Sequence, residues 1–336
     1  MNGKTLMSLI VLTLAAAPAF GQSKTGTTMG QFLLIEPSAR ITGMGNAGVS
    51  MFEGLDAVYY NPAAIGRASR YEVMFAHSAW LADISYDYVA AAIPLGRWGN
   101  GFASVTSLNS GEIDVRTVSA PLGTGERYRV SDVALALGYG KEITDRFSAG
   151  VQVAWLQETI WNSSVSTMTI GLGTRYRISE NGLHIGSSLT NFGTEGRYSG
   201  RDLRILYDND PDRFGDNGAL PGERFTDGYP VPVLFRVGVG MPFRPAQGQA
   251  LSVAVDAFHP NDNTESVSAG AEWTMRDMLA LRAGYQNAFQ QDSEVGLTLG
   301  AGLNGRLDLY RYRFDYAWAD HGRLGSTHRF AVDLAF

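Results

Sequence analysis

The pair Asp320 and His321 comes nearest to hydrolytic chemistry in this sequence. The two residues are adjacent, whereas the other four of the five histidines are scattered along the chain. An acid and a histidine need a second acid or a nucleophile within hydrogen-bond reach to act in hydrolysis. Adjacent residues in an extended loop point apart, and no nucleophile-elbow pattern accompanies this pair. We therefore expect a protein that is not an enzyme and has no cofactor.

A cluster of aspartates is the second arrangement with chemical potential. It consists of Asp208, Asp210, Asp212 and Asp216. Carboxylate oxygens are ligands that Ca²⁺ prefers. Arg213, however, stands where a calcium-binding loop needs its sharp-turn glycine, and no well-placed glutamate completes the set. We interpret the cluster as a solvated loop, with a calcium site as the alternative.

Most other charges alternate with apolar residues along extended segments. In 310–318, for example, Arg311, Arg313 and Asp315 interleave with aromatic residues such as Tyr312 and Phe314. Because strand side chains point alternately to opposite faces, this pattern separates a charged surface from an apolar one. The residues that we place on the charged, inward surface include Arg236, Asp256, Glu272, Arg282, Arg311, Arg313 and Asp315. Unpaired buried charge is costly, so we expect ion pairs and water there.

The elements that carry this pattern are typical of a membrane-spanning barrel. A soluble sandwich alternates in the same way locally. Here the alternation repeats along the whole chain, and aromatic residues lie near strand ends, as at the interfaces of membrane barrels. After the first 21 residues no segment approaches the roughly 20 apolar residues of a membrane helix, and mean hydropathy is −0.08. Only a closed barrel could then span a membrane, because open sheet edges leave backbone groups unpaired in lipid.

The first 21 residues resemble a cleaved secretory leader. Lys4 precedes the apolar run 6–14, and small residues Ala19 and Gly21 suit cleavage before Gln22. The mature chain has no cysteine, so its stability does not depend on disulfides. A net charge of −6 argues against nucleic acid as a partner. Together these features predict localisation in the outer membrane.

About fourteen strands are predicted, an even number as single-chain outer-membrane barrels require. They are 71–79, 84–93, 101–108, 130–139, 147–156, 166–177, 183–192, 233–241, 251–258, 267–273, 279–286, 295–303, 310–318 and 328–336. Alternate connections are short, whereas the opposite set includes 109–129 and 193–232. Short periplasmic turns and long external loops have this distribution, although the first hairpin connection, 80–83, is a short exception.

The segment before the first strand is expected to fill the barrel as a hatch. We divide the chain into a leader (1–21), a hatch (22–70) and a transmembrane barrel (71–336). In the hatch, Asn61, Pro62 and Ala63 form a turn signal, because proline pushes Asn61 into an extended conformation and the asparagine side chain can bond its own turn. Turn chemistry explains these residues, so we interpret them as a fold marker, with a ligand contact as the alternative.

Several motifs resemble the PorV/PorQ family. The hatch carries FLLIEPSAR at 32–40, GMGNAGVS at 43–50 and YYNPAAIG at 59–66. The barrel carries LTNFG at 189–193, ALRAGY at 280–285, FDYA at 314–317 and GSTHR at 325–329. The last residue, Phe336, is similar to the assembly signal of many outer-membrane barrels.

The resemblance implies a barrel similar to the FadL long-chain fatty acid transporters, with a hatch that contains the Asn-Pro-Ala turn. It also implies two functions. One is a non-catalytic component of type IX-like protein secretion and cell-surface attachment, with secreted cargo or other secretion components as partners. The alternative is a transporter of long-chain fatty acids or other hydrophobic small molecules. The charged interior favours the secretion role, since a hydrophobic solute prefers an apolar pocket, although hatch aromatics such as Phe32, Phe52, Tyr59 and Tyr60 could build one.

Overall fold

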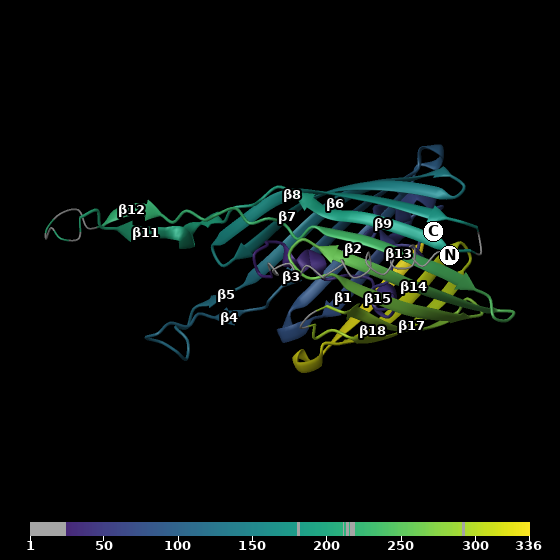
Figure 1. The fold of residues 1–336 in the computed structure, drawn as a ribbon. Helices are drawn as coiled ribbons and strands as arrows, with labels where there is room; N and C mark the ends of the chain where they lie inside the picture. Colours follow the sequence, from purple (N-terminus) through teal and green to yellow (C-terminus); the bar gives the residue numbers. More distant parts are fainter. Residues whose placement is uncertain (1–24, 180–181, 211, 213–214, 216–218, 291–292) are drawn as a thin grey trace, which may run out of the picture.

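A computed structural model describes residues 25–336 except 180–181, 211, 213–214, 216–218 and 291–292. In this part of the chain fourteen antiparallel strands form one closed barrel (Figure 1). They are β1 (Glu72–Ala79), β2 (Ser85–Pro94), β3 (Asn100–Asn109), β6 (Val130–Thr144), β7 (Phe147–Ile160), β8 (Ser163–Arg177), β9 (His184–Gly193), β13 (Leu234–Phe243), β14 (Gln249–Pro260), β15 (Ser266–Met275), β16 (Leu279–Ala288), β17 (Leu297–Leu307), β18 (Tyr310–Asp320) and β19 (Ser326–Ala335). Each strand pairs with the next, and β1 pairs with β19 to close the ring. The predicted fold class is confirmed. The predicted leader lies outside the described residues.

The two ends of the barrel differ in the length of their connections. Short turns join β2 to β3, β6 to β7, β8 to β9, β13 to β14, β15 to β16 and β17 to β18, and the end of β19 lies with them. We call this the short-turn end and the opposite end the long-loop end. At the long-loop end two hairpins project beyond the barrel (Figure 1), β4 (Ile113–Asp114) with β5 (Arg127–Tyr128) and β11 (Arg204–Tyr207) with β12 (Leu220–Glu223).

Side chains on the outer surface of the barrel are apolar, and those on the inner surface are small or polar. On β18, Phe314 is 49% exposed whereas Asp315 is 5% exposed. Leu334 and Val253, which a sandwich would bury in its centre, are exposed on the outside. The strand period of two thus places apolar side chains where lipid contacts a membrane barrel. No helix in the described part of the chain is long and apolar enough to cross a membrane.

The hatch lies inside the barrel (purple in Figure 1). Its described part contains the short helices η1 (Gln31–Leu34), α2 (Ala39–Thr42), α3 (Leu55–Val58) and η2 (Pro62–Arg67). Ser38 caps α2, since its Oγ accepts a hydrogen bond from the Ile41 amide. Most hatch side chains are buried, including Ile41, Met44 and Tyr60 at 0% exposure. The lumen is therefore packed with the chain's own N-terminal segment.

Inward-facing glycines let the hatch backbone contact the barrel wall. Gly270 and Gly284 are opposite each other on β15 and β16. A Cβ at Gly270 would lie 2.1 Å from the Met44 carbonyl oxygen, and one at Gly284 would lie 2.2 Å from the Gly45 nitrogen. No other residue type permits such an approach without movement of backbone. These glycines fix where the hatch can lie.

Candidate functional site

The Asn-Pro-Ala turn fastens the hatch to the β8 side of the wall. Asn61 has φ −153° and Pro62 begins helix η2. The Asn61 Oδ1 accepts a hydrogen bond from the Ala63 amide at 3.0 Å. Its Nδ2 donates to the carbonyl oxygens of Val49 and Thr174 at 2.9 and 3.0 Å. Asn61 is fully buried, so its polar atoms serve the turn and the hatch–wall contact.

Four of the sequence-predicted lumen charges meet in one cluster. Arg282 on β16 donates from Nε to the Glu272 Oε2 at 2.6 Å and from Nη1 to the Asp315 Oδ1 at 2.7 Å. Arg313 donates from Nε to the Asp315 Oδ2 at 2.7 Å. Arg282, Glu272 and Asp315 are at most 5% exposed. The charges satisfy one another, as burial requires.

Two hatch residues complete this ion-pair cluster. Arg40 on α2 binds Glu272 through Nε at 2.8 Å and Nη2 at 2.6 Å. Asp56 on α3 accepts from Arg313, and its second oxygen accepts from the Ser38 hydroxyl at 3.0 Å. Asp333 on β19 also lies 3.3 Å from Arg313. The cluster therefore ties the hatch to the sector of the wall formed by β15, β16, β18 and β19.

Arg236 and Asp256 lie apart from this cluster and contact other parts of the hatch. Arg236 is 1% exposed, and its Nη2 lies 3.2 Å from the Glu36 Oε1. Its guanidinium also lies 5.7 Å from the Tyr60 ring centre. Asp256 accepts a hydrogen bond from the Val49 amide at 2.8 Å. Both residues anchor hatch backbone or side chains from the β13–β14 side.

Arg311 and Phe336 occupy the short-turn end. Arg311 shares a face of β18 with Arg313 and Asp315, yet it is exposed, because it lies at the mouth of the lumen. The alternation in sequence places Arg311 on the inward face and makes no statement about its depth along the strand. Phe336 is 51% exposed and stacks on Tyr71, with ring centres 5.9 Å apart.

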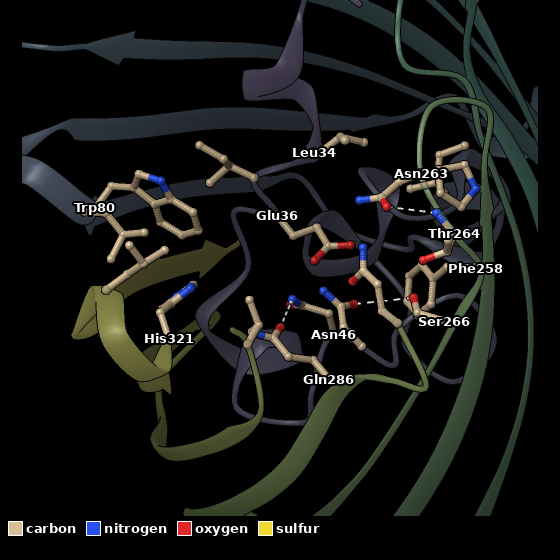
Figure 2. Close-up of a pocket in the computed structure, with 18 of the residues that line it drawn as sticks. Leu34, Glu36, Asn46, Trp80, Phe258, Asn263, Thr264, Ser266, Gln286 and His321 are labelled. Carbon is tan, nitrogen blue, oxygen red and sulfur yellow. Dashed lines mark hydrogen bonds between the residues drawn. The ribbon is translucent and has the colours of Figure 1, made fainter. Parts of the chain in front are cut away.

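A cavity of about 360 Å³ lies between the hatch and the loops of the long-loop end. Figure 2 shows Trp80 and His321 on one side of it and Phe258 and Thr264 on the other. Glu36 points into its centre. The apolar lining residues include Leu34, Ile35, Trp80, Leu234, Phe258 and Leu324. Ten of the nineteen lining residues are polar or charged, but apolar side chains supply most of the lining surface, as is typical of a small-molecule site.

The polar groups of this cavity are held in place by neighbours. Asn46 donates to Gln286 at 2.6 Å, across the hatch–wall boundary. Burial raises the pKa of the Glu36 carboxyl, and the positive charges of Arg236 and Arg329 only partly oppose this effect. Burial also lowers the pKa of His321, and Arg329 adds to that shift. Arg329 also lines the cavity, so a guanidinium lies beside these two groups.

Comparisons with known proteins find similarity in structure but not in sequence. No protein-family model matches the sequence, and no curated protein matches it significantly. Among solved structures, the Pseudomonas putida toluene transporter TodX aligns with TM-score 0.58 at 12% identity, over 89% of this chain and 96% of that chain. The CymD monoaromatic hydrocarbon channel aligns with TM-score 0.53 at 10% identity, over 90% and 97% of the two chains. A Pseudomonas aeruginosa FadL homologue gives TM-score 0.51 at 11% identity, over 89% and 98%. The chain has the FadL-type barrel fold.

The described residues of the two groups weighed for catalysis and metal binding make local hydrogen bonds. The His321 Nε2 shares a hydrogen bond of 3.0 Å with the Thr327 hydroxyl. The Asp320 carboxylate instead accepts from the Gly322 amide at 3.1 Å. Asp208 accepts from the Asp210 amide at 3.0 Å, whereas Asp216 lies outside the described residues. Among the residues that the structure describes, no group of three or more acids, histidines or cysteines could hold a metal ion.

Sequence reasoning missed the hatch charges Glu36, Arg40 and Asp56. Each lies in a segment whose apolar residues are buried, so each needs a buried partner. Glu36 directly follows the apolar run 32–35 and precedes Pro37. A carboxylate in such an apolar setting could have indicated that Glu36 is buried and paired. Its partner Arg236 is 200 residues away, and no local pattern identifies it.

Proposed function

We propose that this protein is an outer-membrane channel for hydrophobic small molecules, with its short-turn end in the periplasm and its long-loop end outside the cell. The cavity between hatch and loops carries this proposal. Its volume of about 360 Å³ lies at the lower end of the usual range for small-molecule pockets, about 300–1,000 Å³. Most of its lining surface is apolar, and it faces the long-loop end, where an external molecule would arrive. The fold shared with a toluene transporter and a monoaromatic hydrocarbon channel also supports it.

In this proposal the hatch (22–70) controls passage through the barrel (71–336), and residues 1–21 direct export. The ion-pair cluster around Arg282 occupies the lumen on the short-turn side of the cavity. An apolar molecule cannot cross buried ion pairs without large desolvation costs. Passage therefore requires the hatch or the cluster to move after the cavity is filled.

A second candidate function is the secretion role that the PorV/PorQ resemblance implies. The two projecting hairpins favour it, because they expose apolar side chains far from the barrel. Val118 between β4 and β5 is 104% exposed, and Leu206 on β11 is 74% exposed. Exposed apolar residues on projecting hairpins suit contacts with another protein. The hairpins would then receive cargo while the lumen stays closed.

Uptake and export measured in the same strains separate the two functions. The substitution Val295→Trp fills the cavity mouth, and Leu122→Trp places the same ring on the exposed β4–β5 hairpin as a control. We expect Val295→Trp to reduce uptake of labelled toluene or labelled fatty acid by roughly tenfold or more, since a filled pocket forfeits about 1.4 kcal/mol or more of binding. Leu122→Trp should leave uptake unchanged.

A third strain carries a deletion of residues 113–128, which removes most of the β4–β5 hairpin. Normal uptake in the Val295→Trp strain would contradict the channel proposal. Loss of surface-protein export on deletion of the hairpin, with uptake intact in every strain, would favour the secretion role. Heat-modifiable gel migration shows that each variant is folded.

A further inference from the structure

Each of the six turns at the short-turn end has an arginine in it or at the strand end beside it. Arg97, Arg146, Arg244 and Arg276 lie in turns, whereas Arg177 and Arg306 are at the ends of β8 and β17. The residues at this end, taken as 67–72, 95–99, 140–146, 177–183, 244–248, 276–278 and 306–311, include ten basic and six acidic side chains. The arginines are spread around the whole circumference, because the turns join successive strand pairs of a closed ring. We call these six residues the arginine ring.

Most of the ring is exposed and not neutralised by the protein itself. Arg97, Arg146, Arg244, Arg276 and Arg306 are exposed. Within the described part of the chain none of the six has a carboxylate oxygen within 4.0 Å. Arg177 and Arg306 instead donate to turn carbonyls of Asp145 and Asp308, both at 3.1 Å. Arg276 and Arg306 also line the hollow at the mouth of the lumen, whereas Arg97, Arg146 and Arg244 do not. These last three present positive charge that an anion outside the lumen can approach.

An aromatic girdle places the ring at the membrane interface. Exposed aromatic side chains gather beside these turns: Tyr71, Trp98, Tyr139, Tyr176, Phe243, Trp273, Tyr310 and Phe336. The Arg97 guanidinium lies 4.9 Å from the centre of the Trp98 ring. Aromatic girdles lie at the level of lipid head groups. The arginines just beyond the girdle are then at the depth of lipid phosphates.

The long-loop end has the opposite charge balance. Its connections, taken as 80–84, 110–129, 161–162, 194–233, 261–265, 289–296 and 321–325, include sixteen acidic and nine basic side chains. The basic excess thus belongs to one rim and is not a property of the whole chain, whose net charge is −6. A positive rim attracts anions within about a Debye length, roughly 8 Å at physiological salt.

We propose that the arginine ring binds the head groups of anionic phospholipids in the leaflet at the short-turn end. Guanidinium groups bind phosphate oxygens through two parallel hydrogen bonds, which suits them to phosphodiester head groups. Arg97, Arg146 and Arg244 lie on three separate turns, between β2 and β3, β6 and β7, and β13 and β14, so lipid around the barrel can reach each of them. An acidic protein partner would contact one sector and would leave the arginines on the far side unexplained. The occupant is therefore lipid.

Native mass spectrometry of the purified full chain tests this proposal. The protein in detergent micelles receives an equimolar mixture of phosphatidylglycerol and phosphatidylcholine with identical acyl chains, and the lipids that remain bound are counted. We expect phosphatidylglycerol to be retained over phosphatidylcholine by about fivefold for each engaged arginine. The triple variant Arg97→Gln, Arg146→Gln, Arg244→Gln should lose most of this preference.

Two further triple variants serve as controls. Arg→Lys at the same three positions keeps the charge and should retain much of the preference. Arg116→Gln, Arg204→Gln and Arg224→Gln remove the same charge from exposed residues of the long-loop end and should leave the preference unchanged. Heat-modifiable gel migration shows that every variant has folded before lipid is added.

Several results would overturn the proposal. Equal retention of the two lipids by the unchanged protein would do so, and so would equal losses in the two Arg→Gln triples, which would mean that net charge alone matters. Displacement of bound phosphatidylglycerol by excess inorganic phosphate would assign the ring to free phosphate. Absence of lipid preference together with binding of polyglutamate would assign it to an acidic protein.

Discussion

At the scale of single residues, buried ion pairs in the lumen hold the hatch against the wall. Glu272 is the centre of the ion-pair cluster, since it accepts hydrogen bonds from Arg40 of the hatch and Arg282 of the wall. It is 3% exposed. Removal of a buried partner leaves an uncompensated charge, which is more costly than loss of an exposed ion pair.

We predict that Glu272→Gln lowers the free energy of unfolding by about 3–5 kcal/mol, because Arg40 and Arg282 lose their shared anion. Urea unfolding in lipid vesicles measures this change. The matched control is Glu265→Gln, which removes the exposed partner of His259. The control should unfold like the unchanged protein. Equal effects of the two substitutions would show that the buried cluster contributes no more to the free energy of unfolding than an exposed ion pair does.

At the scale of elements, the strands could be predicted from sequence and the hatch contacts could not. All fourteen predicted segments overlap the observed strands, because a period of two acts over eight or more residues and needs no distant information. The inward placement of Glu272 and Arg282 follows from the same period. Their hatch partner Arg40 is 232 residues from Glu272, and such a pairing depends on how the hatch lies in the lumen. The same reasoning assigned Arg311 to the correct face but not to the exposed mouth, because periodicity says nothing about depth.

Glycine in the wall provides a test at this scale. We predict that Gly284→Ala displaces the hatch, because the new Cβ would lie 2.2 Å from backbone atoms of residues 44 and 45. Overpacking of this kind costs about 1–3 kcal/mol. Hydrogen exchange of the peptide that contains Met44 should accelerate by roughly tenfold or more, since 1.4 kcal/mol corresponds to a factor of ten.

Gly171→Ala is the matched control for this experiment. Gly171 is also buried in the wall, on β8, but a Cβ there would lie 3.6 Å from the nearest atom, which is an ordinary van der Waals contact. Exchange of hatch peptides should remain unchanged in this variant. If Gly284→Ala leaves exchange as slow as in the control, the hatch is not positioned by wall glycines.

At the scale of the whole molecule, the alternation of apolar and polar side chains along the strands produces three layers. The outer surface of the barrel is apolar, the wall carries the hydrogen-bond ladder, and the interior holds the hatch with its ion pairs. The proposed channel function depends on this order, because the cavity at the long-loop end is meaningful only if a membrane surrounds the barrel. The arginine ring and the acidic connections of the long-loop end give the two ends of the barrel different charge.

The most direct test of this arrangement uses single cysteines on β18, since the native chain has none. A spin label at each of positions 312 to 317, in turn, reports access to oxygen dissolved in lipid after reconstitution into vesicles. The account predicts high access at 312, 314 and 316 and low access at 313, 315 and 317, because alternate positions face lipid and the packed lumen. Uniform access along the strand, or low access at 314 with high access at 315, would contradict it.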